Sequence, residues 1–344
     1  MKRAVSLTIV AVLAITGVIA VLIYSFAPVP QFRSPRVVTI NRGDSFRTVG
    51  DKLQRAGVVR SALVLIGWAE FTGQARAVKP GDYEFGGGET MTAVLRHLVR
   101  GDYLVSIITI PEGLTIWQIG ERLQRAGLAC PDEFEYQARR GPLIAALGLR
   151  PLGAEGYLFP ATYKFSPHAD AQQIVAGMLE KFYSLLTPAV EQRMFALGLN
   201  VRQVVTMASI VEKEAYVAGE RPLVASVFYN RLRLGMPLQS DPTAQYNPEG
   251  EDEPALVAVH TRSAYNTYGF VGLPPGPIAN PGESSIMAAL YPAHTDYLYF
   301  VARGDGTHIF SRTLKEHEQA IAQLKKSGAH SPANIRAPLE TRVK

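Results

Sequence analysis

The sequence predicts an α+β protein with one N-terminal transmembrane helix, a small α/β module, and a mixed α/β domain in which long helices alternate with Pro- and Gly-rich loops. Three observations predict this: an uncharged apolar run at the N-terminus, a strand–helix motif that occurs twice, and a change to long helical segments from Pro142 onward. The 344 residues favour about two domains. With 47% hydrophobic and 19% charged residues, the chain can bury a sizeable core.

The first segment predicts a membrane anchor. Lys2 and Arg3 precede a run that is apolar from Ala4 to Phe26, and a membrane-spanning helix needs about 20 apolar residues. A cleaved signal peptide and a buried soluble helix are the alternatives, but no convincing small-residue cleavage site follows the run. We therefore expect residues 1–27 to form a cytoplasmic stub and a single-pass anchor in the cell (inner) membrane. Residues 28–36 would be a linker stiffened by proline, and the rest of the chain would lie outside the cytoplasm.

A repeated motif organises the next segment. In each copy a β-branched strand precedes a Gly turn, a Ser or Thr helix N-cap, an apolar helical stripe and a terminal glycine. Corresponding residues are 70 positions apart: Gly43 and Gly113, Ser45 and Thr115, Leu53 and Leu123, Gly57 and Gly127. Between the copies, residues 79–85 read as a turn leading into a strand.

These elements define the expected domains. Residues 37–105 form a small α/β module whose strand–helix pattern resembles a LysM-type glycan-binding domain, with a rigid spacer as the alternative. Residues 106–325 form the domain that carries the chemistry. Residues 326–344, rich in Ser, Pro and charge, are expected to be a flexible tail.

The strongest helical pattern in the second half contains two glutamates. Asp170 is expected to cap a helix over 171–186, and Asn200 a helix over 201–215. On the wheel of the second helix, Glu212 and Glu214 flank an apolar stripe on opposite sides, so they cannot share one small cleft. A carboxyl on an apolar border loses hydration and its pKa rises, which acid catalysis at neutral pH requires. Two ordinary helix-edge glutamates paired to Arg or Lys are the alternative.

Several later segments mix aromatic rings with short polar side chains, a combination that binds sugars but also occurs in structural loops. The segments are 155–163, 238–246, 263–268 and the Pro-rich 272–282. Together with the glutamate helix 207–214 and the segments 224–232, 297–302, 308–311 and 313–317, they strongly resemble the endolytic murein transglycosylase family (MltG, YceG-like). The resemblance extends from the N-terminal anchor to about residue 325. The chain departs from the family pattern at Ala161, where an Asp is usual, and at Ala215, where the related lysozyme-like enzymes usually have Ser or Thr.

The resemblance implies non-hydrolytic cleavage of MurNAc-β-1,4-GlcNAc bonds inside nascent peptidoglycan strands, leaving 1,6-anhydro-MurNAc ends. One carboxylic acid suffices, because the C6 hydroxyl of the substrate replaces the second carboxylate that ordinary glycosidases need. The family pattern assigns this role to Glu214, on a lysozyme-like glutamate helix. An enzyme tethered at the membrane could fix strand length, which makes glycan-polymerising wall synthases expected partners.

Further site residues are assigned as substrate-binding candidates: Gln239, Ser240, Asp241 and Thr243 in the glycan cleft, Tyr265, Asn266 and Tyr268 on the N-acetyl sugars, and Glu155 as a supporting carboxylate. Each has a structural alternative, which for Asp241 is a helix N-cap.

Other chemistries lack their motifs. The seven His show no metal spacing, no Gly-x-Ser-x-Gly elbow or nucleotide loop occurs, and the single Cys130 excludes an intramolecular disulfide. We therefore expect no cofactor and no metal. The net charge of +5 is too small to indicate nucleic-acid binding. Two other functions stay open: a catalytically silent, membrane-tethered glycan-binding scaffold, and a hydrolytic muramidase that uses Glu214 with Asp241 or Glu155.

Overall fold

The computed structural model describes residues 2–250, 252, 254 and 258–326, without the side chains of residues 2–11 and 14. The chain divides into two compact units. Unit 1 comprises Met1–Ile107 and Lys164–His168, and unit 2 comprises Ile108–Tyr163 and Ala169–Lys344. All but the first residue of the predicted tail, 326–344, lies outside the described residues.

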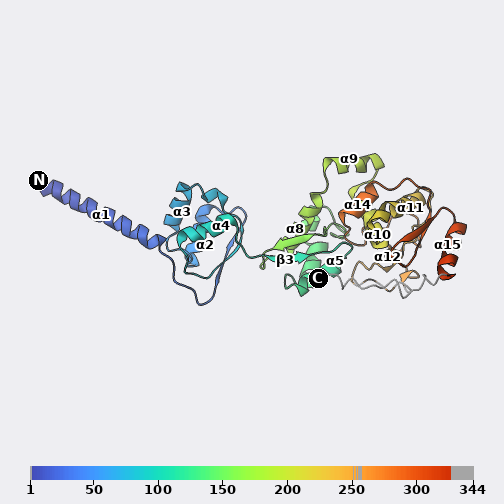
Figure 1. The fold of residues 1–344 in the computed structure, drawn as a ribbon, viewed down its shortest axis with the longest axis horizontal. Coiled ribbons are helices and arrows are strands. Elements are labelled where there is room, and N and C mark those ends of the chain that lie inside the picture. Colours follow the sequence, from blue (N-terminus) through green and yellow to red (C-terminus); the bar gives the residue numbers. More distant parts are fainter. Residues whose placement is uncertain (1, 251, 253, 255–257, 327–344) are drawn as a thin grey trace. The chain divides into compact units, whose positions relative to one another are not determined.

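Unit 1 contains an N-terminal helix followed by a small α/β module (Figure 1). Its elements in chain order are α1 (Lys2–Phe26), β1 (Arg36–Ile40), α2 (Phe46–Arg55), α3 (Ala62–Phe71), the 3-10 turn η1 (Ala75–Ala77), β2 (Gly81–Phe85) and α4 (Met91–Arg100). Strands β1 and β2 pair antiparallel, with Val38 opposite Tyr83. The strand expected over 79–85 is therefore present as β2.

The core of unit 1 lies between this two-stranded sheet and helices α2, α3 and α4. Leu53, Leu65, Tyr83 and Leu98 are each at most 1% exposed and belong to one apolar cluster. Burying a side chain of this size contributes about 1.5–3 kcal/mol, so a module this small can still hold its fold.

Helix α1 covers the predicted anchor segment. Among the described side chains, no single helix is both long and apolar enough to cross a membrane. One pair of helices, Pro188–Leu197 with Val201–Glu214, passes on length and composition but is bent by 89°.

Unit 2 is mainly helical. Its elements are β3 (Ser106–Thr109), which begins in unit 1, α5 (Ile116–Arg125), α6 (Pro131–Arg140), α7 (Pro142–Ala146), β4 (Thr162–Phe165), α8 (Ala171–Tyr183), α9 (Pro188–Leu197), α10 (Val201–Glu214), the 3-10 turn η2 (Ala218–Glu220), α11 (Arg221–Arg233), α12 (Asp241–Gln245), α14 (Glu283–Leu290), β5 (Tyr299–Ala302), β6 (His308–Ser311) and α15 (Leu314–Lys326). Strands β3 and β4 form one pair, and β5 and β6 form another. The mixture of helices and small sheets confirms the predicted α+β class.

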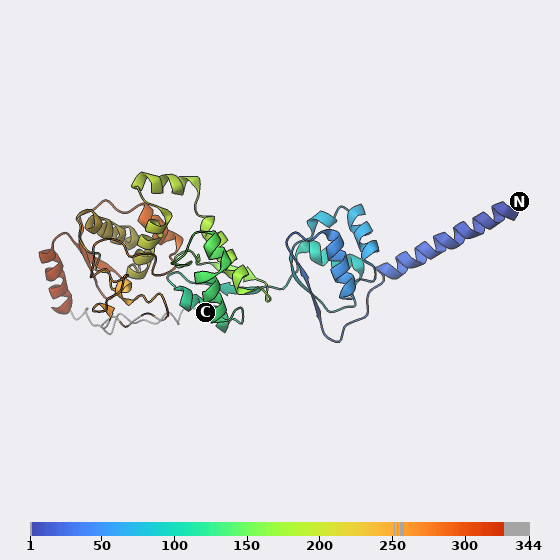
Figure 2. The same ribbon diagram turned by 180° about the vertical axis from the view of Figure 1, so that it is seen from behind.

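Helix α10 lies at the centre of unit 2, against α11, α12 and α14, whereas α9 stands at its margin (Figures 1 and 2). Every residue from Val204 to Val211 is buried. The helix is therefore covered on all sides, whereas the helical wheel predicted a single apolar stripe. A helix held this firmly gives its terminal residue, Glu214, a fixed position.

The repeated motif folds as predicted in both copies. Ser45 and Thr115 cap α2 and α5 by accepting hydrogen bonds from backbone N–H groups one turn on. Gly57 and Gly127 follow the two helices with φ of 68° and 67°, a left-handed conformation that residues with a Cβ rarely adopt. The two copies lie in different units.

The caps predicted for the later helices are also present. Asp170 and Asn200 each form a capping box at the start of α8 and α10. Helix α8 ends at Tyr183, three residues before the predicted end, because Thr187 and Pro188 begin α9.

Candidate active site

Glu214 is the last residue of α10, at the point where the chain leaves the core. Ala215 continues in an extended conformation (φ −99°, ψ 106°). The carboxyl of Glu214 is half-buried and lines an open groove of about 340 Å³. A carboxyl at this position can exchange a proton with a molecule in the groove.

The surroundings of Glu214 raise the pKa of its carboxyl toward neutrality. Burial raises its pKa from 4.5 to about 7, and the charge of Asp241 acts in the same direction. Its place at the C-terminal end of a helix also disfavours negative charge. The Ser240 hydroxyl, which donates a hydrogen bond of 2.6 Å to Oε1, and the nearby Arg231 lower the pKa. The balance leaves an acid that can give up a proton and take it back.

The segment that carries Ser240 is held in a strained conformation. Gln239 has a φ of 52°, in the left-handed region, where residues other than Gly rarely lie. The buried Arg231 donates hydrogen bonds to the Leu238 carbonyl (2.9 Å) and the Gln239 side chain (3.2 Å). The backbone N–H of Gln239 donates to the carbonyl of Thr267, and the backbone N–H of Ser240 donates to the hydroxyl of Thr267. These contacts fix the Ser240 hydroxyl beside Glu214.

A second carboxylate lies in the same groove. Asp241 is exposed at the start of α12, and its Oδ1 accepts a hydrogen bond of 2.6 Å from the Tyr268 hydroxyl. The preceding residue, Ser240, occupies the N-cap position that we considered for Asp241. Asp241 can therefore contact a ligand and supply the charge that favours protonation of Glu214.

The C-terminal part of the chain also contributes to the groove. The Tyr299 ring stacks on His317, with ring centroids 5.3 Å apart. The complete lining is Glu214, Arg231, Leu238, Gln239, Asp241, Tyr268, Tyr299, Phe300, Leu314 and His317. Flat rings beside amide and carboxylate groups are the chemistry that binds sugar rings and their hydroxyls.

The other glutamate of the helix has different surroundings. Glu212 accepts hydrogen bonds from Arg221 (2.9 Å) and from the backbone N–H of Gly282 (3.0 Å). Arg221 also contacts Glu112 at 3.2 Å. Glu212 therefore lies in an ion-pair network away from the groove, and the two glutamates do not share a cleft.

Glu155 is also placed outside the groove. It is 3% exposed and accepts hydrogen bonds from the backbone N–H of Ile116, the Tyr246 hydroxyl and the Asn280 amide. Burial raises its pKa to about 7. Its contacts join the start of α5 to the Pro-rich segment 272–282, so Glu155 has a structural role.

The predicted site residues thus fall into two groups. Gln239, Ser240, Asp241 and Tyr268 surround or contact Glu214, whereas Thr243, Tyr265, Asn266 and Glu155 are buried behind them. The Asn266 amide, for example, donates to the carbonyls of Val259 and Thr261. The buried residues shape the loops that carry the groove residues.

Residues that had no role assigned from the sequence complete the groove: Arg231, Leu238, Tyr299, Phe300, Leu314 and His317. The segments 224–232, 297–302 and 313–317, which contain five of these residues, belong to the family resemblance. Their rings and amphipathic side chains were the available signal. Arg231 lies in the segment 224–232, but its residue type alone gave no sign of a groove position, since an arginine near a helix end is usually a surface residue.

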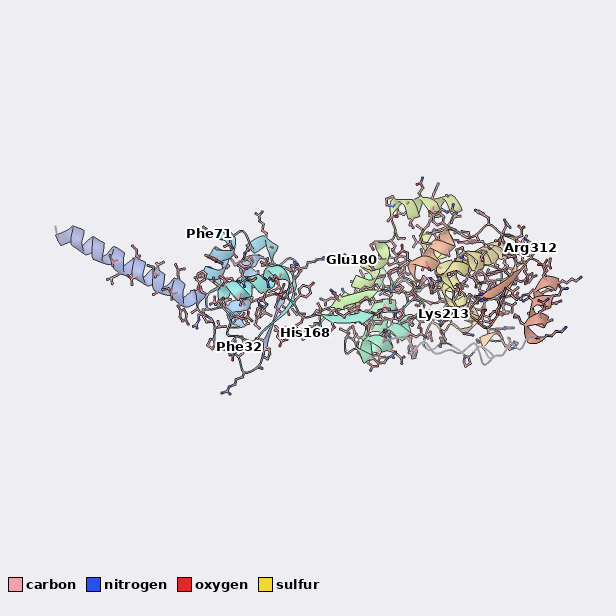
Figure 3. All side chains as sticks on the ribbon, in the orientation of Figure 1. Phe32, Phe71, His168, Glu180, Lys213 and Arg312 are labelled. Carbon is pink, nitrogen blue, oxygen red and sulfur yellow. The ribbon has the colours of Figure 1, made fainter. Side chains whose placement is uncertain are left out.

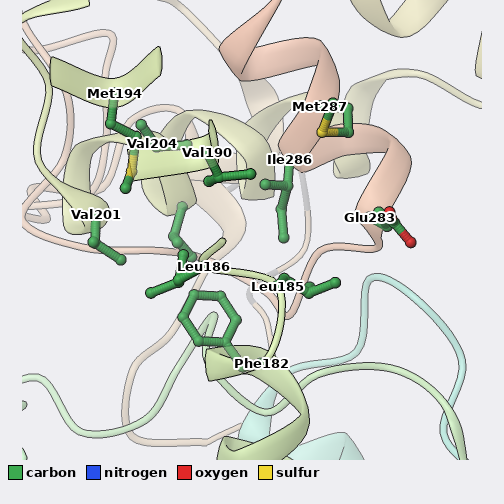
Figure 4. A pocket seen from close by; sticks show the side chains of 11 residues that line it. Phe182, Leu185, Leu186, Val190, Met194, Val201, Val204, Glu283, Ile286 and Met287 are labelled. Carbon is green, nitrogen blue, oxygen red and sulfur yellow. The ribbon is translucent and has the colours of Figure 1, made fainter. Parts of the chain in front are cut away.

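A smaller cavity of about 50 Å³ lies between α8, α9, α10 and α14 (Figure 4). Its lining is almost entirely apolar, including Phe182, Leu186, Met194 and Ile286, and Glu283 is the charged residue among its lining groups. It is a packing space of the core. Within the described part of the chain, no group of three His, Cys, Asp or Glu side chains is placed to hold a metal ion.

The fold and the groove define a class of protein: a largely helical unit in which one carboxyl group, with its pKa raised to about 7, lines an open groove among aromatic and polar side chains. The chain belongs to the YceG-like family, whose sequence profile matches residues 38–323. This confirms the predicted family.

Related proteins agree with this assignment. The chain is 34% identical over 311 residues to an endolytic murein transglycosylase of Bacillus subtilis (strain 168), covering 82% of this chain and 83% of that protein. It is 29% identical over 319 residues to an endolytic murein transglycosylase of Streptococcus pneumoniae (strain D39), covering 83% of this chain but 58% of that protein. A crystal structure of a yceG-like protein from Listeria monocytogenes matches with a TM-score of 0.57 and 30% identity, covering 84% of this chain and all of that one.

Proposed function

We propose that this protein is a membrane-anchored endolytic murein transglycosylase that cleaves MurNAc-β-1,4-GlcNAc bonds in nascent peptidoglycan, with Glu214 as its acid and base. The observation that carries the proposal is the position of the Glu214 carboxyl at the groove, where burial raises its pKa to about 7. The names of the relatives support the same activity.

The reaction needs one proton donor and no water. The Glu214 carboxyl gives its proton to the glycosidic oxygen, and the bond between that oxygen and C1 of MurNAc breaks. The C6 hydroxyl oxygen of the same MurNAc bonds to C1, and its proton passes to the Glu214 carboxylate. The products are a 1,6-anhydro-MurNAc end and a GlcNAc with a free 4-hydroxyl, and the enzyme is regenerated.

The surrounding groups have separate roles in this proposal. The Ser240 hydroxyl orients the carboxyl of Glu214 and stabilises it while it is ionised. Gln239, Asp241 and Tyr268 bind the hydroxyl and N-acetyl groups of the sugars in the groove. Asp241 also favours the protonated state of Glu214.

We propose that α1 anchors the protein in the cell membrane, with the catalytic unit outside the cytoplasm. Its 25 residues form a helix of about 38 Å at 1.5 Å per residue, and the hydrocarbon core of a bilayer is about 30 Å thick. Wall synthases that polymerise glycan would supply its substrate at the same membrane. Glycan binding by residues 37–105 stays a prediction.

Product analysis tests the activity. The full-length protein in detergent is incubated with uncrosslinked glycan strands, and the fragments are weighed by mass spectrometry. We expect anhydro ends inside strands, and we expect Glu214→Gln to reduce cleavage by about 100-fold to 10,000-fold, the range for loss of a general acid. Glu212→Gln is the matched control, because the same change on the same helix lies outside the groove.

Each alternative gives a different result. Products 18 Da heavier, with reducing ends, would identify a hydrolytic muramidase and refute the transglycosylase. Binding without cleavage would identify a glycan-binding scaffold. If the Glu214→Gln protein were active and the Glu212→Gln protein were folded but inactive, the catalytic acid would be Glu212 and not Glu214.

A further inference from the structure

Helix α3 of unit 1 exposes an apolar stripe. Nine of its ten residues, ALVLIGWAEF, are uncharged. Leu63 and Phe71 are 79% and 84% exposed, and with the exposed Gly67 they recur at intervals of four residues on one face. Trp68, partly buried, borders this stripe. Isolated exposed apolar residues are common, but two large apolar side chains on one helix face, with an aromatic ring at their border, can mark an interaction surface.

The stripe lies beside the end of the N-terminal helix. The Phe26 ring, on the last residue of α1, contacts the Trp68 ring edge-on at 5.1 Å. Arg60, just before α3, lies 4.3 Å from the Tyr24 ring and donates a hydrogen bond of 2.9 Å to the Pro28 carbonyl. These contacts hold α3 against the point where α1 meets the module.

We propose that the α3 stripe, Leu63, Gly67 and Phe71 with Trp68 at its border, inserts into the outer surface of the membrane that α1 anchors. Trp and Tyr concentrate at the level of lipid headgroups, which is where Tyr24 and Trp68 would lie. An interfacial helix of this kind sinks its apolar face roughly 5–10 Å into the headgroup region. Arg60 would lie at the depth of the lipid phosphates. This inference rests on the proposed anchoring by α1.

The opposite end of unit 1 supplies an internal control. Figure 3 shows Phe71 on the side of the module from which α1 leaves and His168 at the other end. Both side chains are exposed. If α3 lies on the membrane, a probe at residue 71 contacts lipid and a probe at residue 168 stays in water.

The test uses the full-length protein with Cys130→Ser, so that one cysteine is introduced at a time. Phe71→Cys or His168→Cys is labelled with the environment-sensitive dye NBD, and the protein is reconstituted in phosphatidylcholine–phosphatidylglycerol vesicles. Flotation of the vesicles reports anchoring. We expect blue-shifted NBD emission at residue 71, quenched by a lipid spin-labelled near its headgroup, and water-like emission at residue 168. Leu63→Glu should reduce the blue shift at residue 71 without preventing flotation, and its circular dichroism should match that of the parent.

The outcomes separate the two proposals. Protein that floats but gives water-like emission at residue 71 overturns the membrane-surface role of α3 and leaves the anchor intact. Protein that fails to float overturns both. Crosslinking of two Phe71→Cys copies in vesicles, without lipid quenching, would assign the stripe to a second copy of this chain and also overturn the proposal.

Discussion

Replacing Ser240 by alanine should shift the pH dependence of cleavage upward. The Ser240 hydroxyl donates a 2.6 Å hydrogen bond to Glu214 Oε1, and this bond lowers the pKa of Glu214. A hydrogen bond to a charged group contributes about 1.5–3 kcal/mol, which corresponds to roughly 1–2 pH units. The inflection should therefore move from about 7 to roughly 8–9.

The direction of this shift follows from the role of the acid. Cleavage needs protonated Glu214, so activity is constant below the pKa and falls about tenfold per pH unit above it. The Ser240→Ala protein should keep its activity to higher pH. Its maximal rate should be lower, because the carboxylate that forms during proton transfer has lost a donor.

The assay is the release of anhydro ends, measured as kcat/KM between pH 5 and pH 10. Ser226→Ala is the matched control, because it removes another buried serine hydroxyl of unit 2 that bonds to Leu223 and Thr295 and not to Glu214. Its inflection should stay near that of the parent. An unchanged or lower inflection in the Ser240→Ala protein would refute the assignment of Glu214 as the titrating acid.

Three further results are expected. Asp241→Asn removes a charge that raises the pKa of Glu214, so the inflection should fall below that of the parent while anhydro products persist; loss of all cleavage would favour Asp241 as a hydrolytic base. Glu155→Gln should flatten the pH dependence of the melting temperature. Burial raises the pKa of Glu155 from 4.5 to about 7, so the folded state holds this proton more tightly than the unfolded state. The resulting stabilisation is complete below pH 4.5 and is lost as the pH rises to about 7, a change of roughly 3 kcal/mol in the free energy of unfolding. Glu212→Gln should lower the free energy of unfolding by about 3 kcal/mol in denaturant titration, because it leaves Arg221 with Glu112 as its one acidic partner among the described residues. An unchanged stability would show that the ion pair contributes nothing.

The elements that the sequence predicted best are those with local causes. Ser45, Thr115, Asp170 and Asn200 cap helices through bonds to residues three positions on, so each cap is visible in a few letters of sequence. The separation of Glu212 from Glu214 likewise follows from helix geometry alone.

The back of the site could not be predicted in this way. Glu155 bonds to Asn280 across 125 positions and to Tyr246 across 91, and no local pattern encodes such pairs. In the structure, Gln239, Ser240 and Asp241 of the segment 238–246 lie beside Glu214. Which of its side chains face the groove depends on the left-handed backbone of Gln239, which Arg231 and Thr267 hold from other elements.

The two copies of the strand–helix motif have unequal surroundings. In the second copy, the N–H of Gly113 donates to the Asn280 carbonyl, and Glu112 contacts Arg221. The matching positions of the first copy, Arg42 and Gly43, border an open surface pocket of unit 1. Both glycines have a positive φ (92° and 78°), so the difference lies in the residue before them: Arg42 borders open surface, whereas Glu112 is tied to the framework behind Glu214. A random-mutation library scored for cleavage should lose far more variants at Glu112 than at Arg42, its counterpart 70 positions earlier.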